Sequence, residues 1–292
     1  MKDKEIVSLV KLLEDNDTTV SGIVSKKLLE KGKSAIPDLE KAWESSINPG
    51  VQLKIEEIVH GIQLNQLKQE LHDWINEGAD DVLYGSYLVA RYQYPDLLFS
   101  DIEAKVEILR RSIWVEFNDN LTALEKVRII NHIFFAVNKF TGNSANFYSP
   151  GNSYINLVLE TKKGNPITLA VLYASVSQKL GLPVYGVNLP LNYVLAYELQ
   201  SYVEDPDGIL FYINPFNKGN VLSRKEIDFF LQEQKLEKKP EFYKPCNNPT
   251  TIERMFRNLQ FAFENMKQTV KAAEITDLLE VFKQNNTRNT IQ

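Results

Sequence analysis

Few side chains in this sequence have the chemistry for nucleophilic catalysis or metal binding. The single thiol is Cys246, and the three histidines are His60, His72 and His132. A hydroxyl or thiol attacks an amide efficiently only when a base accepts its proton, and zinc sites need closely spaced Cys and His ligands. These scattered residues have neither arrangement, so we predict no metal site and no cofactor.

Thr168 is a candidate nucleophile because it lies near the start of a predicted helix. Its hydroxyl can face a cleft, where it would need His132 or a carboxylate within about 3 Å as a base. Alternatively, the hydroxyl supports the helix cap or bonds to a backbone carbonyl. His132 lies among apolar residues, which is also typical of a histidine at the boundary of a core. The sequence leaves both interpretations of Thr168 open.

The composition indicates a globular protein of two or three units. The chain has 292 residues, of which 43% are hydrophobic and 24% are charged, and its net charge is -5. A sequence-independent nucleic-acid binder needs a basic face, so that class is not expected. No apolar run approaches the ~20 residues of a membrane helix, and the charged N-terminus does not resemble a signal peptide. We therefore expect a cytoplasmic protein with no membrane partner.

Residues 1–75 have the apolar periodicity of helices only. Gly32 is placed to end the second helix, and the segment from Asn48 to Gly50 should break the chain after the third. Asp17 or Thr18 is the expected N-cap of the second helix. Two helix pairs with a period of roughly 30 residues predict a HEAT-like module. A plain helical bundle remains the alternative.

Residues 76–237 begin with helices and change to an α+β pattern at residue 164. Asn165 is a suitable N-cap and Pro166 suits the first helical position, while Gly181 should end that helix. Strand-like runs follow at 184–189, 193–203 and 209–213, with a turn at 205–208. This pattern predicts a helix packed on a small antiparallel sheet of three strands.

Residues 238–292 are expected to form a linker and a C-terminal helical pair. Pro240, Pro245 and Pro249 favour a linker at 238–249. Thr250 and Glu253 have the spacing of a capping box at the start of the first of these helices.

Three stretches carry a family resemblance. They are residues 152–160, residues 164–169 (Gly-Asn-Pro-Ile-Thr-Leu) and residues 180–190 (Leu-Gly-Leu-Pro-Val-Tyr-Gly-Val-Asn-Leu-Pro). Together they resemble the SirB-type transglutaminase-like family over roughly residues 78–230. The resemblance implies a helix-rich α+β fold with a transglutaminase-like core. It also implies three set positions, which hold Cys, His and Asp in transglutaminase-like enzymes.

This chain departs from the enzymes at all three positions. Pro166 stands at the position of the cysteine. The family's Pro-Gly-His-Phe is replaced by Pro-Leu-Asn-Tyr, which puts Asn192 at the histidine position, and its Asp-Pro-Phe is replaced by Asn-Pro-Phe, which puts Asn214 at the aspartate position. Neither amide can accept and return a proton near neutral pH. Joint loss of the three groups would leave only binding and any oxyanion hole.

Amide side chains can instead line a binding cleft, because they donate and accept hydrogen bonds without charge. The candidate binding residues are Asn165, Thr168, Asn188 and Asn217, in addition to Pro166, Asn192 and Asn214 at the three replaced catalytic positions. Tyr148, Tyr185 and Tyr212 are expected nearby. The other interpretation is that asparagine replaced His and Asp only because the shapes are similar.

Three hypotheses for the function follow. The first is a non-catalytic transglutaminase-like protein that binds a protein or peptide, or a small polar ligand. The second is an amide-bond hydrolase or acyltransferase with unconventional residues. The third is a purely structural scaffold in which side chains fill the cleft.

Overall fold

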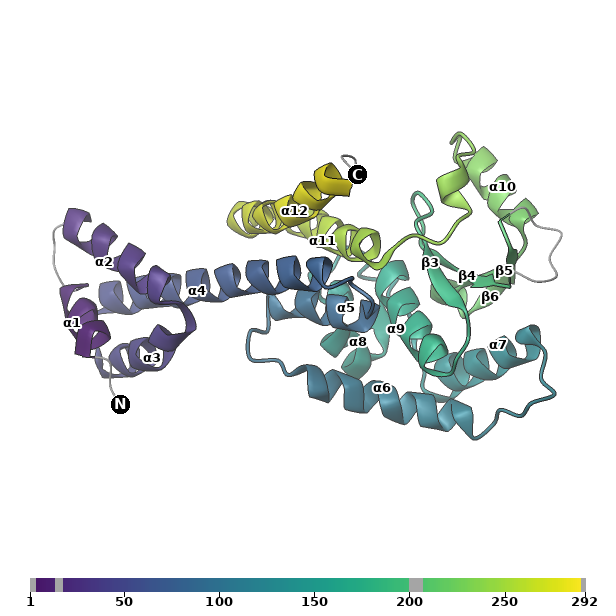
Figure 1. Cartoon of the computed structure of the whole chain (residues 1–292), viewed down its shortest axis with the longest axis horizontal. Coiled ribbons are helices and arrows are strands. Elements are labelled where there is room, and N and C mark those ends of the chain that lie inside the picture. Colours follow the sequence, from purple (N-terminus) through teal and green to yellow (C-terminus); the bar gives the residue numbers. More distant parts are fainter. Residues whose placement is uncertain (1–3, 14–17, 200–206, 290–292) are drawn as a thin grey trace. The chain divides into compact units, whose positions relative to one another are not determined.

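The chain divides into two units, Met1–Asp73 and Trp74–Gln292. A computed structural model describes residues 4–13, 18–199 and 207–289. Helices predominate, and a small antiparallel sheet lies in the second unit, so the helix-rich α+β class is confirmed (Figure 1).

The first unit is built from helices around one apolar core. The helices are α1 (Lys4–Leu12), α2 (Thr18–Lys31), α3 (Ile36–Ser45) and α4 (Pro49–Asn76), whose last residues belong to the second unit. Leu13, Leu28 and Leu39 are fully buried in this core. Gly32 ends α2 with a left-handed φ of 62°, as its position predicts. Of the two expected N-caps of α2, Asp17 lies outside the described residues and Thr18 is the first residue of the helix.

The centre of the second unit is α9 (Pro166–Lys179), whose residues from Ile167 to Ser177 are all buried. It contacts α5 (Val82–Arg91), α6 (Phe99–Trp114) and α8 (Ile155–Thr161), together with strands β3 (Val184–Val187) and β4 (Val194–Glu198) (Figure 1). Gly181 follows α9 with a φ of 76°, a conformation in which glycine avoids the steric cost of a Cβ atom. The helices that precede α9 are α5 (Val82–Arg91), α6 (Phe99–Trp114), α7 (Ala123–Asn131), which continues as a π-helix (His132–Val137), and α8 (Ile155–Thr161).

The sheet has four strands where the sequence predicts three. They are β3 (Val184–Val187), β4 (Val194–Glu198), β5 (Ile209–Asn214) and β6 (Asn220–Leu222), antiparallel in that order. β6 has only three residues, which is too short to give a strand periodicity. Two-residue strands β1 (Thr141–Gly142) and β2 (Lys163–Gly164) pair in parallel. Residues 205 and 206 of the predicted turn lie outside the described residues.

The C-terminal segment, residues 238–292, contacts the rest of the second unit. Helix α10 (Arg224–Glu233) precedes this segment, whose own helices are α11 (Asn248–Asn265) and α12 (Thr269–Asn289). The Cys246 N–H donates to the Gly186 carbonyl of β3 at 2.8 Å, and the Asn248 side chain donates to the Ala79 carbonyl at 2.8 Å. α11 also contacts α5 and α9, so residues 238–292 belong to the second unit.

The predicted cap of α11 is wrong by three residues. Asn247, not Thr250, caps the helix, because its side-chain oxygen accepts the Thr250 N–H at 2.9 Å. Pro249 then occupies one of the first helical positions, where its missing N–H costs no hydrogen bond.

Candidate functional site

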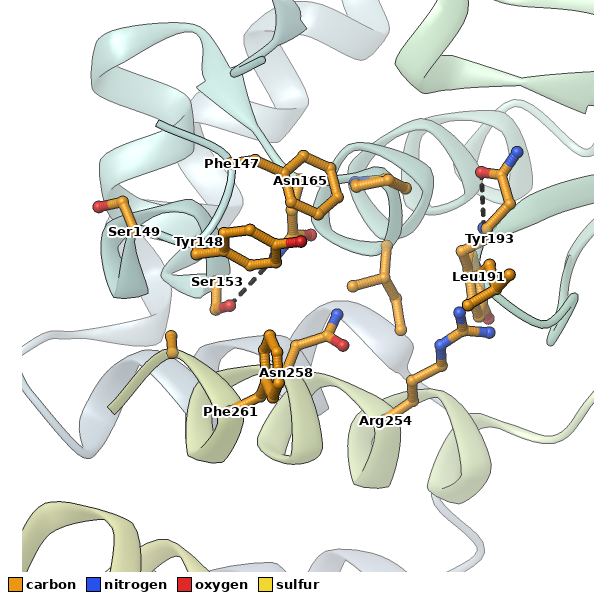
Figure 2. A pocket seen from close by; sticks show the side chains of 14 residues that line it. Phe147, Tyr148, Ser149, Ser153, Asn165, Leu191, Tyr193, Arg254, Asn258 and Phe261 are labelled. Atoms are coloured by element: carbon orange, nitrogen blue, oxygen red, sulfur yellow. Dashed lines mark hydrogen bonds between the residues drawn. The ribbon is translucent and has the colours of Figure 1, made fainter. Parts of the chain in front are cut away.

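A cavity of about 420 Å³ lies where the N-terminus of α9 meets α11 (Figure 2). This volume falls in the range of small-molecule pockets, about 300–1,000 Å³. The loop before α8 and the turn before β4 complete its walls. The pocket is lined by Phe147, Tyr148, Ser149, Ser153, Asn165, Pro166, Ile167, Leu191, Asn192, Tyr193, Arg254, Asn258, Phe261 and Ala262.

Asn165 organises the α9 side of the pocket. It caps α9, because its Oδ1 accepts the Thr168 N–H at 2.9 Å and the Thr168 hydroxyl at 3.0 Å. Its Nδ2 donates to the Ser153 hydroxyl at 3.1 Å. These three bonds tie the start of α9 to the turn that precedes α8, so Asn165 is a structural part of the pocket wall.

A second asparagine shapes the loop that carries the aromatic wall. Asn152 is buried, and its Nδ2 donates to the carbonyls of Asn146 at 2.7 Å and Phe147 at 3.0 Å. The loop thereby presents Tyr148, which is 59% exposed, toward α11. The Tyr148 ring lies edge-on to the Phe261 ring, with 5.5 Å between their centroids. One end of the pocket is therefore apolar and open to solvent.

The turn before β4 has an unusual backbone. Leu191 adopts a left-handed φ of 59° and is 73% exposed. The Oδ1 of Asn192 accepts the Tyr193 N–H at 2.8 Å. Tyr193 is buried, and its hydroxyl lies 2.7 Å from the Thr251 hydroxyl. Gly186 makes this burial possible, since a Cβ atom there would collide with the Tyr193 hydroxyl.

α11 supplies the wall opposite α9. Arg254, Asn258 and Phe261 lie four and seven residues apart, so they project from one face of the helix (Figure 2). Arg254 Nη1 donates to the Leu189 carbonyl at 2.7 Å and to Asn188 Oδ1. Desolvation lowers the pKa of the Arg254 guanidinium, which nevertheless stays charged.

The pocket contains only some of the residues that the sequence predicts for a site. Pro166, Asn192 and Asn165 line it together. Asn214 does not line it, and its side chain instead caps the turn Pro215–Asn217 by accepting the Asn217 N–H at 3.2 Å.

The other predicted binding residues have different surroundings. Asn217 is exposed beyond β5. Asn188 is not among the lining residues, and its Oδ1 accepts a hydrogen bond from Arg254. Thr168 is 0% exposed, so its hydroxyl supports the cap and does not face the cleft. Of the three tyrosines, only Tyr148 lines the pocket, while Tyr212 is buried in the core of the sheet.

The sequence reasoning missed the contribution of α11. The apolar period of this helix draws attention to the core face, with Phe256 and Leu259. The pocket residues Arg254, Asn258 and Phe261 form a second face of α11. This face combines a charged, an amide and an aromatic side chain, a composition that is also common on solvent-exposed helix surfaces. The i, i+4, i+7 spacing was the available signal.

No nucleophile and base meet in the pocket among the residues that the structure describes. The described lining has no thiol, imidazole or carboxylate. Thr168 bonds to Asn165 alone among the described side chains, and His132 is exposed on the π-helix. The Cys246 thiol lies 3.5 Å from the Tyr193 hydroxyl, outside the lining. Within residues 4–13, 18–199 and 207–289, no three His, Cys, Asp or Glu side chains are grouped to hold a metal ion.

Nothing in the described helices is both long and apolar enough to span a bilayer.

Comparisons with known proteins place these observations in a family. The family model described as "Transglutaminase-like superfamily" matches residues 100–257. A UPF0162 protein of Xylella fastidiosa is 31% identical over 200 residues, which cover 65% of this chain and 67% of that protein. A UPF0162 protein of Vibrio cholerae is 29% identical over 153 residues, or 51% of this chain and 54% of that protein.

A third relative shares a smaller part. F-box only protein 21 of Mus musculus is 28% identical over 139 residues, which are 44% of this chain and 20% of that protein. No solved structure matches the chain. Since the matched region spans more than half of its residues and contains α9, the sheet and the first part of α11, the chain belongs to the transglutaminase-like superfamily.

Proposed function

We propose that this protein binds a ligand in the α9–α11 pocket and does not catalyse hydrolysis or acyl transfer there. The observation that carries the proposal is the chemistry of the described lining, in which amides, aromatic rings, two serine hydroxyls and one guanidinium surround an open cavity without an imidazole or carboxylate to act as a base. Attack on an amide needs an activated nucleophile, and neither Pro166 nor Asn192 supplies the thiol or the base.

The open cavity favours binding over the scaffold hypothesis. A scaffold with a filled cleft would leave no room for a ligand, whereas this cavity measures about 420 Å³. Exposed aromatic rings beside amide groups suit a protein segment or peptide, because the rings offer apolar contact and the amides fix its orientation. The SirB-type assignment and the HEAT-like interpretation of the N-terminal helices remain part of this proposal.

The test has a catalytic arm and a binding arm. In the first, the full chain is incubated with peptide p-nitroanilides, and separately with a glutamine-containing peptide and a primary amine. We expect no turnover above that of buffer. Turnover that disappears in Asn192→Ala would contradict the proposal.

In the binding arm, peptides are selected on the full chain from a random library and measured by fluorescence polarisation. We expect binding to weaken at least tenfold in Phe261→Ala, which removes a pocket wall. Phe229→Ala is the matched control, because Phe229 is exposed on α10 outside the pocket. Selected peptides that bind both variants equally, or an absence of binders, would favour the scaffold hypothesis.

A further inference from the structure

Among the described residues that line the pocket, Arg254 alone carries a charge. It is partly buried, and its neighbours are neutral: the Leu189 carbonyl, the Asn188 amide and the Tyr193 ring, whose centroid lies 5.6 Å from the guanidinium carbon. No carboxylate of the described residues forms an ion pair with it. A partly desolvated cation without a counter-charge is costly, and an anion entering the pocket would reduce that cost.

The hydrogen bonds of Arg254 leave part of its donor fork available. Both of its hydrogen bonds within the described residues use Nη1, which fixes the guanidinium against the turn before β4. Nε and Nη2 have no acceptor among the described residues. A planar guanidinium held in place with two adjacent donor atoms is suited to a carboxylate, which can accept two parallel hydrogen bonds.

The rest of the lining indicates what is attached to that carboxylate. Asn258 lies one turn along α11 from Arg254, and its amide makes no hydrogen bond within the described part of the chain. Phe261 lies about 10 Å from Arg254 along the helix axis, from seven residues at 1.5 Å each. The exposed Phe261 and Tyr148 rings therefore form an apolar end opposite the charged end (Figure 2).

A single cation in a neutral lining favours a carboxylate over a phosphate group. Phosphate recognition in proteins uses clusters of arginines or rows of backbone N–H groups. Here Arg254 stands alone, and Pro166 removes one of the N–H groups that the start of α9 would otherwise offer.

We propose that the pocket binds the C-terminal carboxylate of a peptide that ends in apolar or aromatic residues. The carboxylate pairs with Arg254, the last peptide group reaches Asn258, and the apolar side chains contact Phe261 and Tyr148. This inference rests on the proposed function of the same pocket and names the chemistry of its ligand.

The test compares two labelled peptides on the full chain by fluorescence polarisation. Both have the sequence Gly-Ser-Gly-Leu-Phe with fluorescein at the N-terminus, and one ends in a free acid while the other ends in an amide. We expect the acid to bind at least tenfold more tightly. A small aromatic acid, phenylpropionate, serves as competitor. We expect at least tenfold weaker competition from it than from the unlabelled peptide acid, and equal competition would overturn the peptide assignment.

Variants of two arginines on α11 locate the carboxylate. Arg254→Gln should reduce binding of the acid to the level of the amide. Arg257→Gln is the matched control, because Arg257 is exposed and paired with Glu253, and it should bind the acid unchanged. Arg254→Lys keeps the positive charge but lacks the paired N–H donors of the guanidinium, so it should bind the peptide acid with intermediate affinity. This variant keeps the test valid if Arg254→Gln folds poorly.

The two proposals fail in different ways. Equal affinity for acid and amide, with Phe261→Ala abolishing both, would overturn the carboxylate inference and leave ligand binding in the pocket intact. Binding of the acid that survives Arg254→Gln, or no binding of either peptide, would also overturn the carboxylate inference. A failure of the proposed function would appear instead as turnover, or as selected peptides indifferent to Phe261→Ala.

Discussion

Replacing Asn165 with alanine should destabilise the second unit by about 2–4 kcal/mol. Loss of an N-cap costs about 1 kcal/mol. The substitution also leaves the fully buried Thr168 hydroxyl without its acceptor, which costs about 1–3 kcal/mol more. Asn165→Asp keeps both acceptor bonds and puts a negative charge at a helix N-terminus, but it loses the donor to the Ser153 hydroxyl, so its cost should be smaller than that of Asn165→Ala without being zero.

Urea unfolding followed by tryptophan fluorescence measures this loss. Of the three tryptophans, Trp43 lies in the first unit, whereas Trp74 and Trp114 lie in the second. A Trp43→Phe background therefore restricts the signal to the unit that contains Asn165. With a slope of about 2.5 kcal/mol per M, the midpoint of the alanine variant should fall by about 0.8–1.6 M.

A second substitution tests the reason for the loss. Thr168→Val removes the hydroxyl that Asn165→Ala leaves unsatisfied, so the double variant should be more stable than Asn165→Ala alone. A midpoint for Asn165→Ala within about 0.2 M of the parent at unchanged slope would refute the reasoning. So would a double variant whose losses simply add.

Three further predictions concern the turn, the sheet and the acid stability of the second unit. Gly186→Ala should lower the stability of the second unit by about 1–3 kcal/mol through overpacking against Tyr193. Adding Tyr193→Phe should recover part of that loss in thermal unfolding. A double variant in which the two losses simply add would contradict this prediction. Leu191→Gly should be about 1 kcal/mol more stable than Leu191→Ala in urea, because only glycine adopts the left-handed φ without strain; the reverse order would refute it. The hydrogen bond from Arg224, aided by Lys244, holds the pKa of Asp207 below its ordinary value of 3.8, so its stabilisation is complete above that value and is lost as the pH falls below it. Asp207→Asn should therefore flatten the fall in stability between about pH 4 and pH 2, and parallel curves for the two proteins would exclude this role.

Local signals in the sequence predicted the elements that have recognisable capping residues and a clear periodicity of apolar residues. Asn165, Pro166 and Gly181 bound α9 as expected, because caps and left-handed positions are decided by a few neighbouring residues. The short strand β6 gave no such signal. The cap of α11 was misassigned because the Thr250–Glu253 spacing competes with Asn247, and only the fold decides between them.

The site was harder to predict than the fold, because its walls come from distant segments. Pro166 and Asn192 were identified through their resemblance to catalytic positions, and both line the pocket. No sequence motif identified Arg254 and Asn258 as pocket residues, because they reach the pocket only through the packing of α11 against α9. Asn217 was expected among the amides of the cleft, but it is exposed in the turn after β5.

The packing of α11 also has a consequence for the order of folding. The hydrogen bond from Asn248 to Ala79 joins residues 169 positions apart. Contacts of such long sequence separation close large loops and are slow to form. During synthesis, α9 and the sheet emerge before α11, so a nascent chain exposes one wall of the pocket to solvent until the last helices dock. The pocket is thus complete only after α11 has docked on α9.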